Sequence, residues 1–401
     1  MQKRFNLFKF CSLVLGLALV FSCSNDEPNP DLPLTGEVVI IELNSAINSS
    51  VSGSATFEQR EDNSTLITLR ISGTKTGVIF PSSIHFNSIA EGGDLAISLT
   101  DIDGTTGKST TIVTKLNNGS PVSYNHLLDF DGHIMILDSS GNTTNPLIQE
   151  DIGQNVLTGN QKVYLINSVS DPNIKGTVTF AERENRETLI TVDLINDNSA
   201  TQRPGHIHRN TAAEDGEIAV RLKETVGGKS STNVSELEDG TIITYDELIQ
   251  FDGYVNIHAS FSQISVFVAQ GDIGQNALTG ENITYTLIQK DGSGISGVVK
   301  LYERVNGETL AIAELLGTAA GNIHPGHIHA NTAILGGEIV YILKPINGET
   351  GKSVNNISML DNGLPITFTE LLSYNGHVNI HLSMDDLKTL VAQGNIGRNA
   401  D

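Results

Sequence analysis

Hydrophobic and polar residues alternate with a period of two along most of the chain. The runs TVTFAER from Thr177 and TLITVDL from Thr188 are examples, and turn-forming residues such as Asn306 and Gly307 separate the runs. Because successive side chains of a strand point to opposite faces of a sheet, this alternation predicts strands with one buried face. Many short strands separated by turns favour an all-β, antiparallel sandwich fold.

Only short stretches have the spacing of a helix. They are YNHLLDF from Tyr124, YDELIQF from Tyr245, FTELLSY from Phe368 and SMDDLKTL from Ser383. Each is long enough for one or two turns, so we expect helical connections between strands and no helical layer.

One unit occurs three times. The triplet LTG begins at Leu34, Leu157 and Leu278, and each copy ends in a related run, either DIGQN or NIGRN. A period of about 120 residues is a domain length, which is too long for a solenoid repeat. We therefore expect three tandem antiparallel β-sandwich domains at 34–156, 157–277 and 278–401, with short junctions that restrict hinge motion.

The N-terminus has the pattern of an export signal. A basic start precedes the apolar run FCSLVLGLALVF, which ends at Cys23 in a sequence that resembles a bacterial lipobox. We expect a lipoprotein signal peptide at 1–22, a lipid on Cys23 and a Pro-rich tether at 23–33. The protein would then be held in the cell envelope, at the outer membrane. The alternative is an ordinary signal peptide that leaves Cys23 as a free thiol.

Net charge restricts the partners. There are 24 basic and 46 acidic residues, so the formal charge is −22. Such an acidic chain lacks the clustered cations that phosphate contacts need, and nucleic acid is excluded as a partner. A lipid on Cys23 would supply the contact with a membrane that the acidic body itself does not favour. No feature of the sequence identifies a protein or glycan ligand.

Histidines form one pattern in the second and third copies. Each copy has an HxH pair and a later single histidine, which are His206, His208 and His258 in the second copy and His327, His329 and His381 in the third. Residues i and i+2 of a strand share a face, so each pair directs two imidazoles to one point. A third imidazole would complete a site for copper or zinc. The first copy has Ser83 and Leu137 at two of the positions, so we expect no metal there.

A structural role is the alternative interpretation of these residues. Histidines near strand ends can donate to loop carbonyls and hold a sandwich closed without binding metal. Two other histidines of the third copy, His324 and His377, align with Arg203 and Tyr254 of the second. We assign them to the surface or to the surroundings of the site and exclude them from the ligand set.

The histidine strands resemble those of the CHRD (chordin-type) domain family of bacterial exported proteins. PGHIH from Pro204 and from Pro325 is similar to the first family motif, and GYVNIH and GHVNIH, which end at His258 and His381, are similar to the second. The resemblance extends over all three copies. CHRD domains are similar in fold to Cu/Zn superoxide dismutase, where an HxH strand and a later strand supply three copper ligands. The resemblance therefore implies a Greek-key sandwich with a copper-type site.

The chain also departs from the dismutase pattern. It lacks the long loop that carries the bridging histidine and the zinc ligands, and the closing segments from Ser262 and Asp385 lack the arginine that guides superoxide. We therefore expect a lipid-anchored binding or structural module with metal sites in the second and third copies. The alternative function is a copper-dependent oxidoreductase of the superoxide dismutase type.

Overall fold

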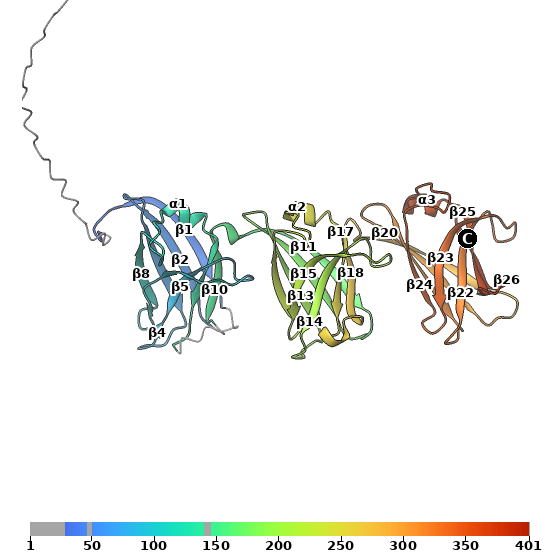
Figure 1. Cartoon of the computed structure of the whole chain (residues 1–401), viewed down its shortest axis with the longest axis horizontal. Helices are drawn as coiled ribbons and strands as arrows, with labels where there is room; N and C mark the ends of the chain where they lie inside the picture. Colours follow the sequence, from blue (N-terminus) through green and yellow to red (C-terminus); the bar gives the residue numbers. More distant parts are fainter. Residues whose placement is uncertain (1–28, 46–49, 140–145, 401) are drawn as a thin grey trace, which may run out of the picture.

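Strands make up most of the protein. The computed structural model describes residues 29–45, 50–139 and 146–400, so Cys11, Cys23 and the expected signal peptide lie outside the described residues. The strands sort into three consecutive domains that lie in a row, each around its own hydrophobic core (Figure 1). The predicted all-β, antiparallel fold is confirmed.

The first domain forms two sheets, in the orders β1-β2-β3-β8-β7-β4 and β10-β9-β5-β6. Its elements are β1 (Leu34–Leu43), β2 (Ser52–Arg60), β3 (Thr65–Ser72), β4 (Ile79–Phe80), β5 (Ser82–Phe86), β6 (Leu95–Ser98), β7 (Ile102–Asp103), β8 (Lys108–Val113), α1 (Tyr124–Leu128), β9 (Gly132–Ile136) and β10 (Ile148–Ile152). The short helix η1 (Gly153–Asn155) leads into the second domain.

The second domain forms one curved sheet in the order β15-β14-β17-β18-β11-β12-β13-β16. Its elements are β11 (Leu157–Ser168), β12 (Lys175–Arg183), β13 (Thr188–Ile195), β14 (Arg203–Arg209), β15 (Ile218–Thr225), β16 (Lys229–Val234), α2 (Tyr245–Leu248), β17 (Asp252–His258), η2 (Phe261–Gln263) and β18 (Phe267–Gly274). Because β13 pairs with β16 and β14 pairs with β17, the connections cross as in a Greek key.

The third domain repeats this order and closes into a barrel, since β23 pairs with β24 and β19 pairs with β26. Its elements are β19 (Leu278–Gln289), β20 (Ser296–Arg304), β21 (Thr309–Leu316), β22 (Ile323–Ala330), β23 (Ile339–Asn347), β24 (Lys352–Ile357), α3 (Phe368–Leu372), β25 (Asn375–Ser383) and β26 (Asp386–Gly397). Closure of the barrel leaves fewer unpaired strand edges.

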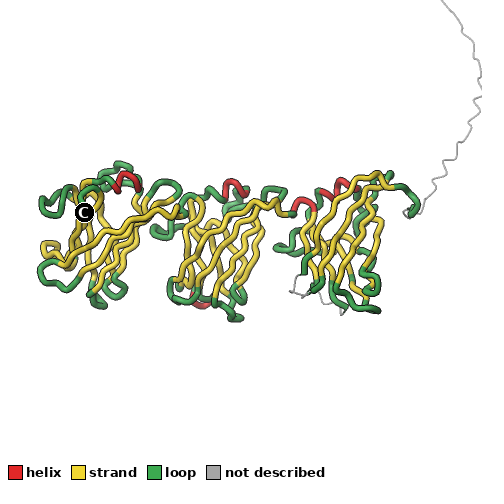
Figure 2. The backbone as a smooth tube through the Cα atoms, turned by 180° about the vertical axis from the view of Figure 1, so that it is seen from behind, coloured by secondary structure: helices red, strands yellow, loops and turns green. Residues whose placement is uncertain are grey.

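Three of the four predicted helical segments are confirmed. Helices α1, α2 and α3 lie along one edge of the row of domains (Figure 2). The fourth prediction, SMDDLKTL from Ser383, is wrong. Ser383 ends β25 and Asp386 begins β26, and the carboxylate of Asp386 accepts the N–H groups of Lys388 and Thr389. Pairing with β25 and this local turn override the helical spacing.

A buried ion pair joins each domain to the next. Arg183 of β12 donates to Asp151 of the first domain, and Arg304 of β20 donates to Asp272 of the second, both at an N···O distance of 2.7 Å. The two guanidinium groups are almost completely buried. Arg304 also donates to the carbonyl of Asn276, close to the start of the third domain. The arginine therefore holds the segment that links the two domains and also holds the third domain against the second.

The substitution Asp272→Asn tests this junction. It keeps the oxygen that accepts the Ala212 N–H but removes the charge opposite the buried guanidinium of Arg304. Removing one partner of a buried pair costs about 3 kcal/mol, so we expect the unfolding free energy of the third domain to fall by that amount in calorimetry. Asp239→Asn is the control, because the Arg209–Asp239 pair is exposed and should contribute little. Equal stability of wild type and Asp272→Asn would contradict this role.

Candidate metal centre

Strand β14 presents two histidines on the outer face of the second domain. Ile207 points into the core and is fully buried, so its neighbours His206 and His208 point outwards together. Gly205 allows the strand to approach the core closely, because a Cβ there would lie 3.1 Å from Cδ1 of Ile257. Burial of the apolar residues therefore places the histidines on the outer face of the sheet.

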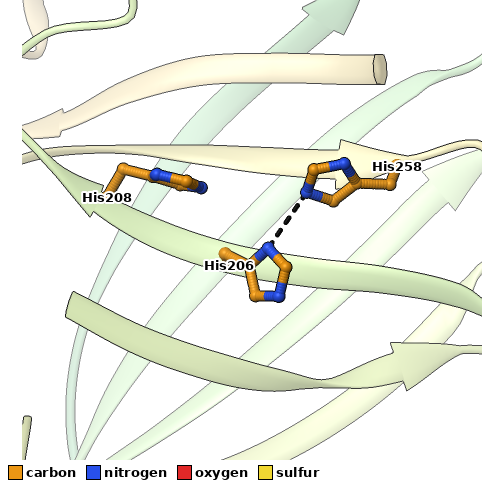
Figure 3. A group of neighbouring side chains, drawn as sticks. All are labelled: His206, His208 and His258. Carbon is orange, nitrogen blue, oxygen red and sulfur yellow. Dashed lines mark hydrogen bonds between the residues drawn. The ribbon is translucent and has the colours of Figure 1, made fainter. Parts of the chain in front are cut away.

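The third histidine comes from the neighbouring strand β17. His206 lies opposite Asn256, which places His258 two residues further along on the same outer face. A register shift between β17 and β18 occurs at His258, next to the fully buried Ile257. The three rings converge (Figure 3), and one nitrogen of each lies within 4.8 Å of the others.

Backbone carbonyls determine which nitrogens face the site. The Nδ1–H of His208 donates to the carbonyl of Gly216 at 2.8 Å, and that of His258 donates to the carbonyl of Ile264. A carbonyl can only accept, so these rings carry their proton on Nδ1 and a lone pair on Nε2. Nε2 of His208 is buried and has no hydrogen-bond partner. Such an atom is a candidate metal ligand.

His206 joins the site through its other nitrogen. Its Nδ1 lies 3.0 Å from Nε2 of His258, and this hydrogen bond connects the two strands. Burial, together with the neighbouring His258, His208 and Arg221, lowers the pKa of His206 to about 4. Burial also lowers the pKa of His258. These imidazoles are therefore neutral at pH 7, which is the form that binds a metal.

The third domain builds a similar arrangement, in which Nδ1 of His381, unlike that of His258, has no hydrogen-bond partner. Nδ1 of His327 lies 3.0 Å from Nε2 of His381, and the Nδ1–H of His329 donates to the carbonyl of Gly337 at 2.9 Å. Nε2 of His329 is buried without a hydrogen-bond partner, as in the second domain. Burial lowers the pKa of both His327 and His381. The six predicted ligands thus form two clusters, one in each domain.

The first domain keeps part of the framework without the cluster. The Nδ1–H of His85 donates to the carbonyl of Gly93 at 3.0 Å, but Nε2 of His85 lies 3.1 Å from the hydroxyl of Ser83. Leu137 occupies the position of the third histidine. Among the residues that the structure describes, this domain has no group of three potential ligands. The nitrogen that is unpaired in the other two domains is hydrogen-bonded here.

Both histidines that we assigned to the surface or to the surroundings of the site are buried, so the surface assignment is wrong. The exposed fraction is 0% for His324 and 1% for His377. The imidazole of His324 donates to the carbonyl of His381, and the ring of His377 stacks on that of His329. They support the ligands from behind. Their burial depends on pairing between distant strands, which the sequence pattern does not reveal.

One charged neighbour of the site was not predicted. Arg221 of β15 lies directly opposite His206 in the strand pairing and forms an exposed ion pair with Glu238. Arg221 lies outside the closing segments, on another strand of the same sheet. Ile342 occupies the equivalent position beside His327, so the two clusters differ by one positive charge. A sequence alignment of the copies locates Arg221, but only the register places it beside His206.

The arrangement can hold a metal ion with three neutral nitrogens. These are Nδ1 of His206 and Nε2 of His208 and His258, with the corresponding atoms of His327, His329 and His381 in the third domain. Three imidazoles suit borderline ions such as Cu(II) and Zn(II) and leave a coordination position for a further ligand. Hydrogen bonds from the far side of His208 and His258 hold these two rings in place, as is usual for metal-binding histidines.

Comparison with known proteins identifies no relative that could name this site. No protein-family model, no curated protein and no solved structure matches the chain. The chemistry of the two clusters rests on the fold and on the geometry of the histidines themselves.

Proposed function

We propose that the second and third domains are metal-binding modules, each holding one Cu(II) or Zn(II) ion. The main support is the pair of buried Nε2 atoms, on His208 and His329, that have no hydrogen-bond partner. A buried polar atom without a partner costs about 1–3 kcal/mol. A bound ion would remove this penalty, whereas the purely structural role leaves it in place.

In the second domain, binding would also require one proton to move. In the metal-free protein, His258 accepts at Nε2, so His206 must donate from Nδ1. To hold a metal, His206 would offer the lone pair of Nδ1, and its proton would reside on Nε2. Copper, when bound, would supply one-electron chemistry, and zinc would supply Lewis acidity. The first domain would serve only as a structural spacer, because Ser83 already satisfies His85.

For localisation, we propose a lipid anchor on Cys23 that holds the three domains in the cell envelope, at the outer membrane. The lipobox-like run before Cys23 is the support for this proposal. Among the described residues, no helix is long and apolar enough to cross a membrane. The proposed role is that of a lipid-anchored binding or structural module with CHRD-like domains.

A copper-dependent oxidoreductase is the second candidate function. Arg221 beside His206 could attract an anion to the second domain, although Glu238 offsets its charge. The third domain has Ile342 at that position and Asp361 nearby, which disfavours an anionic substrate. Superoxide consumption by the copper-loaded chain decides between the candidates. Rapid turnover that disappears in His258→Ala would favour the enzyme.

The first test measures how many ions the chain binds. We expect the chain from residue 24 onward to bind two Cu(II) ions in equilibrium dialysis followed by metal analysis. His208→Ala should remove one ion and the double variant His208→Ala/His329→Ala both, because each loses an unpaired Nε2 donor. His85→Ala is the matched control and should leave the number at two. Two ions retained by the double variant would refute the assignment.

A second test uses pH and the metal-free protein. Since the pKa of His206 is about 4 when folded and 6.5 when unfolded, the unfolded chain binds more protons between these values. The stability from His206 is present above pH 6.5 and is lost as pH falls towards 4. We expect the unfolding free energy of the second domain to fall by about 2 kcal/mol from pH 7 to pH 5 through this group. The His206→Gln variant should lose this part of the pH dependence in calorimetry; the same dependence in both proteins would contradict it.

The anchor is tested by fractionation of cells that express the full chain. Cys23→Ala removes the thiol that would carry the lipid, so the protein should move from the membrane fraction to the soluble fraction. Cys11→Ala is the control and should leave the protein in the membrane fraction. A Cys23→Ala variant that stays with the membrane would place the anchor elsewhere.

A further inference from the structure

The two junctions between domains use the same face of the upstream domain. Besides the buried ion pair, Lys223 donates to the carbonyl of Ala90, and Lys344 donates to the carbonyl of Ala213. At the second junction, Asn356 also donates to the carboxylate of Glu214. A groove of about 550 Å³ lies between the second and third domains, and it is lined partly by Asn167. Polar and charged contacts therefore hold each downstream domain against the domain that precedes it.

The third domain presents the corresponding face. Asn395 stands where the junction aspartates Asp151 and Asp272 stand in the other domains. Its side-chain oxygen accepts the N–H of Ala333 at 2.8 Å, just as Asp272 accepts that of Ala212. The local hydrogen bond is kept, but the charge that would face an arginine is absent.

Three apolar side chains are exposed on this face. Ile334 is 94% exposed, Leu335 is 78% exposed and Ile288 is 66% exposed. The first two domains have small or polar residues at these positions. Ile334 corresponds to Ala90 and Ala213, Leu335 to Glu91 and Glu214, and Ile288 to Asn44 and Asn167. The face that meets a partner domain in the first two copies is thus apolar and locally uncharged in the third. Exposed apolar patches of this kind mark interaction sites.

The first domain of another chain does not suit this face. Thr100 replaces the junction lysines Lys223 and Lys344, so that donor is missing. Arg60, the equivalent of Arg183 and Arg304, already donates to the carbonyls of Asn29 and Leu32. Asn395 offers no carboxylate in exchange. Repetition of the internal junction from chain to chain, head to tail, is therefore disfavoured.

We propose that this end face, defined by Ile288, Ile334, Leu335 and Asn395, joins two copies of the chain tail to tail. A two-fold axis brings each patch against itself, and such dimers are the commonest oligomers. Overall the chain is strongly acidic, with a formal charge of −22, so two carboxylate-bearing faces would repel each other. Leu335 in place of a glutamate and Asn395 in place of an aspartate remove that repulsion only at this end.

Sedimentation equilibrium of the chain from residue 24 onward tests the proposal. This chain keeps all three domains and lacks both cysteines and the apolar run. We expect a reversible dimer in the micromolar range. The double variant Ile334→Ala/Leu335→Glu gives the third domain the residues of the second, so the dimer should dissociate at least about tenfold more readily. Ile242→Ala, at an equally exposed position of the second domain, should have no effect.

Crosslinking determines the orientation. Leu335→Cys introduces the only cysteine of this chain, and a flexible bis-maleimide should link two such chains, whereas Leu34→Cys in the first domain should not self-link. Links between Leu335→Cys and Leu34→Cys chains in a mixture would indicate head-to-tail contact and overturn the proposal. Three other results would also overturn the proposal. They are a monomer at every concentration, a dimer that the double variant does not weaken, and a monomer that binds neutral lipid vesicles through Leu335.

Discussion

Burial of Ile207 and Ile257 fixes how β14 lies against β17, and the position of the histidines depends on that register. Both isoleucines are fully buried in the core of the second domain. With these residues inward, His206, His208 and His258 must share the outer face, and a shift of one residue would turn them into the core. The third domain uses Ile328 and Ile380 in the same way. The candidate metal centre therefore depends on the core of the sandwich.

The three copies share this strand framework and differ in the side chains that it carries. All three orient one imidazole with a glycine carbonyl, from Gly93, Gly216 or Gly337. In the first copy, however, a serine hydroxyl occupies the nitrogen that the other two leave unpaired. Residues that form the internal junctions are likewise replaced at the corresponding positions of the first and third domains, such as Thr100 and Asn395. The strand framework is therefore shared by the three copies, whereas the side chains around the histidine positions differ.

Much of this could be predicted from local patterns. Alternation predicted the strands, and the i, i+2 spacing placed His206 and His208 on one face. What depended on distant pairing could not be predicted. The carbonyl of Gly216 selects the free nitrogen of His208, the register brings Arg221 beside His206, and strand packing buries His324. The segment after Ser383 has helical spacing, yet its pairing with β25 makes it a hairpin.

We propose that the two histidine clusters bind metal through specified nitrogens, and anomalous diffraction at the copper edge, from crystals of the copper-loaded chain, can locate the ions. We expect one peak bounded by Nδ1 of His206 and Nε2 of His208 and His258, and a second at the equivalent atoms of His327, His329 and His381. No peak should lie beside His85. Copper bound only at surface carboxylates, with both histidine clusters empty, would refute metal binding by the histidines.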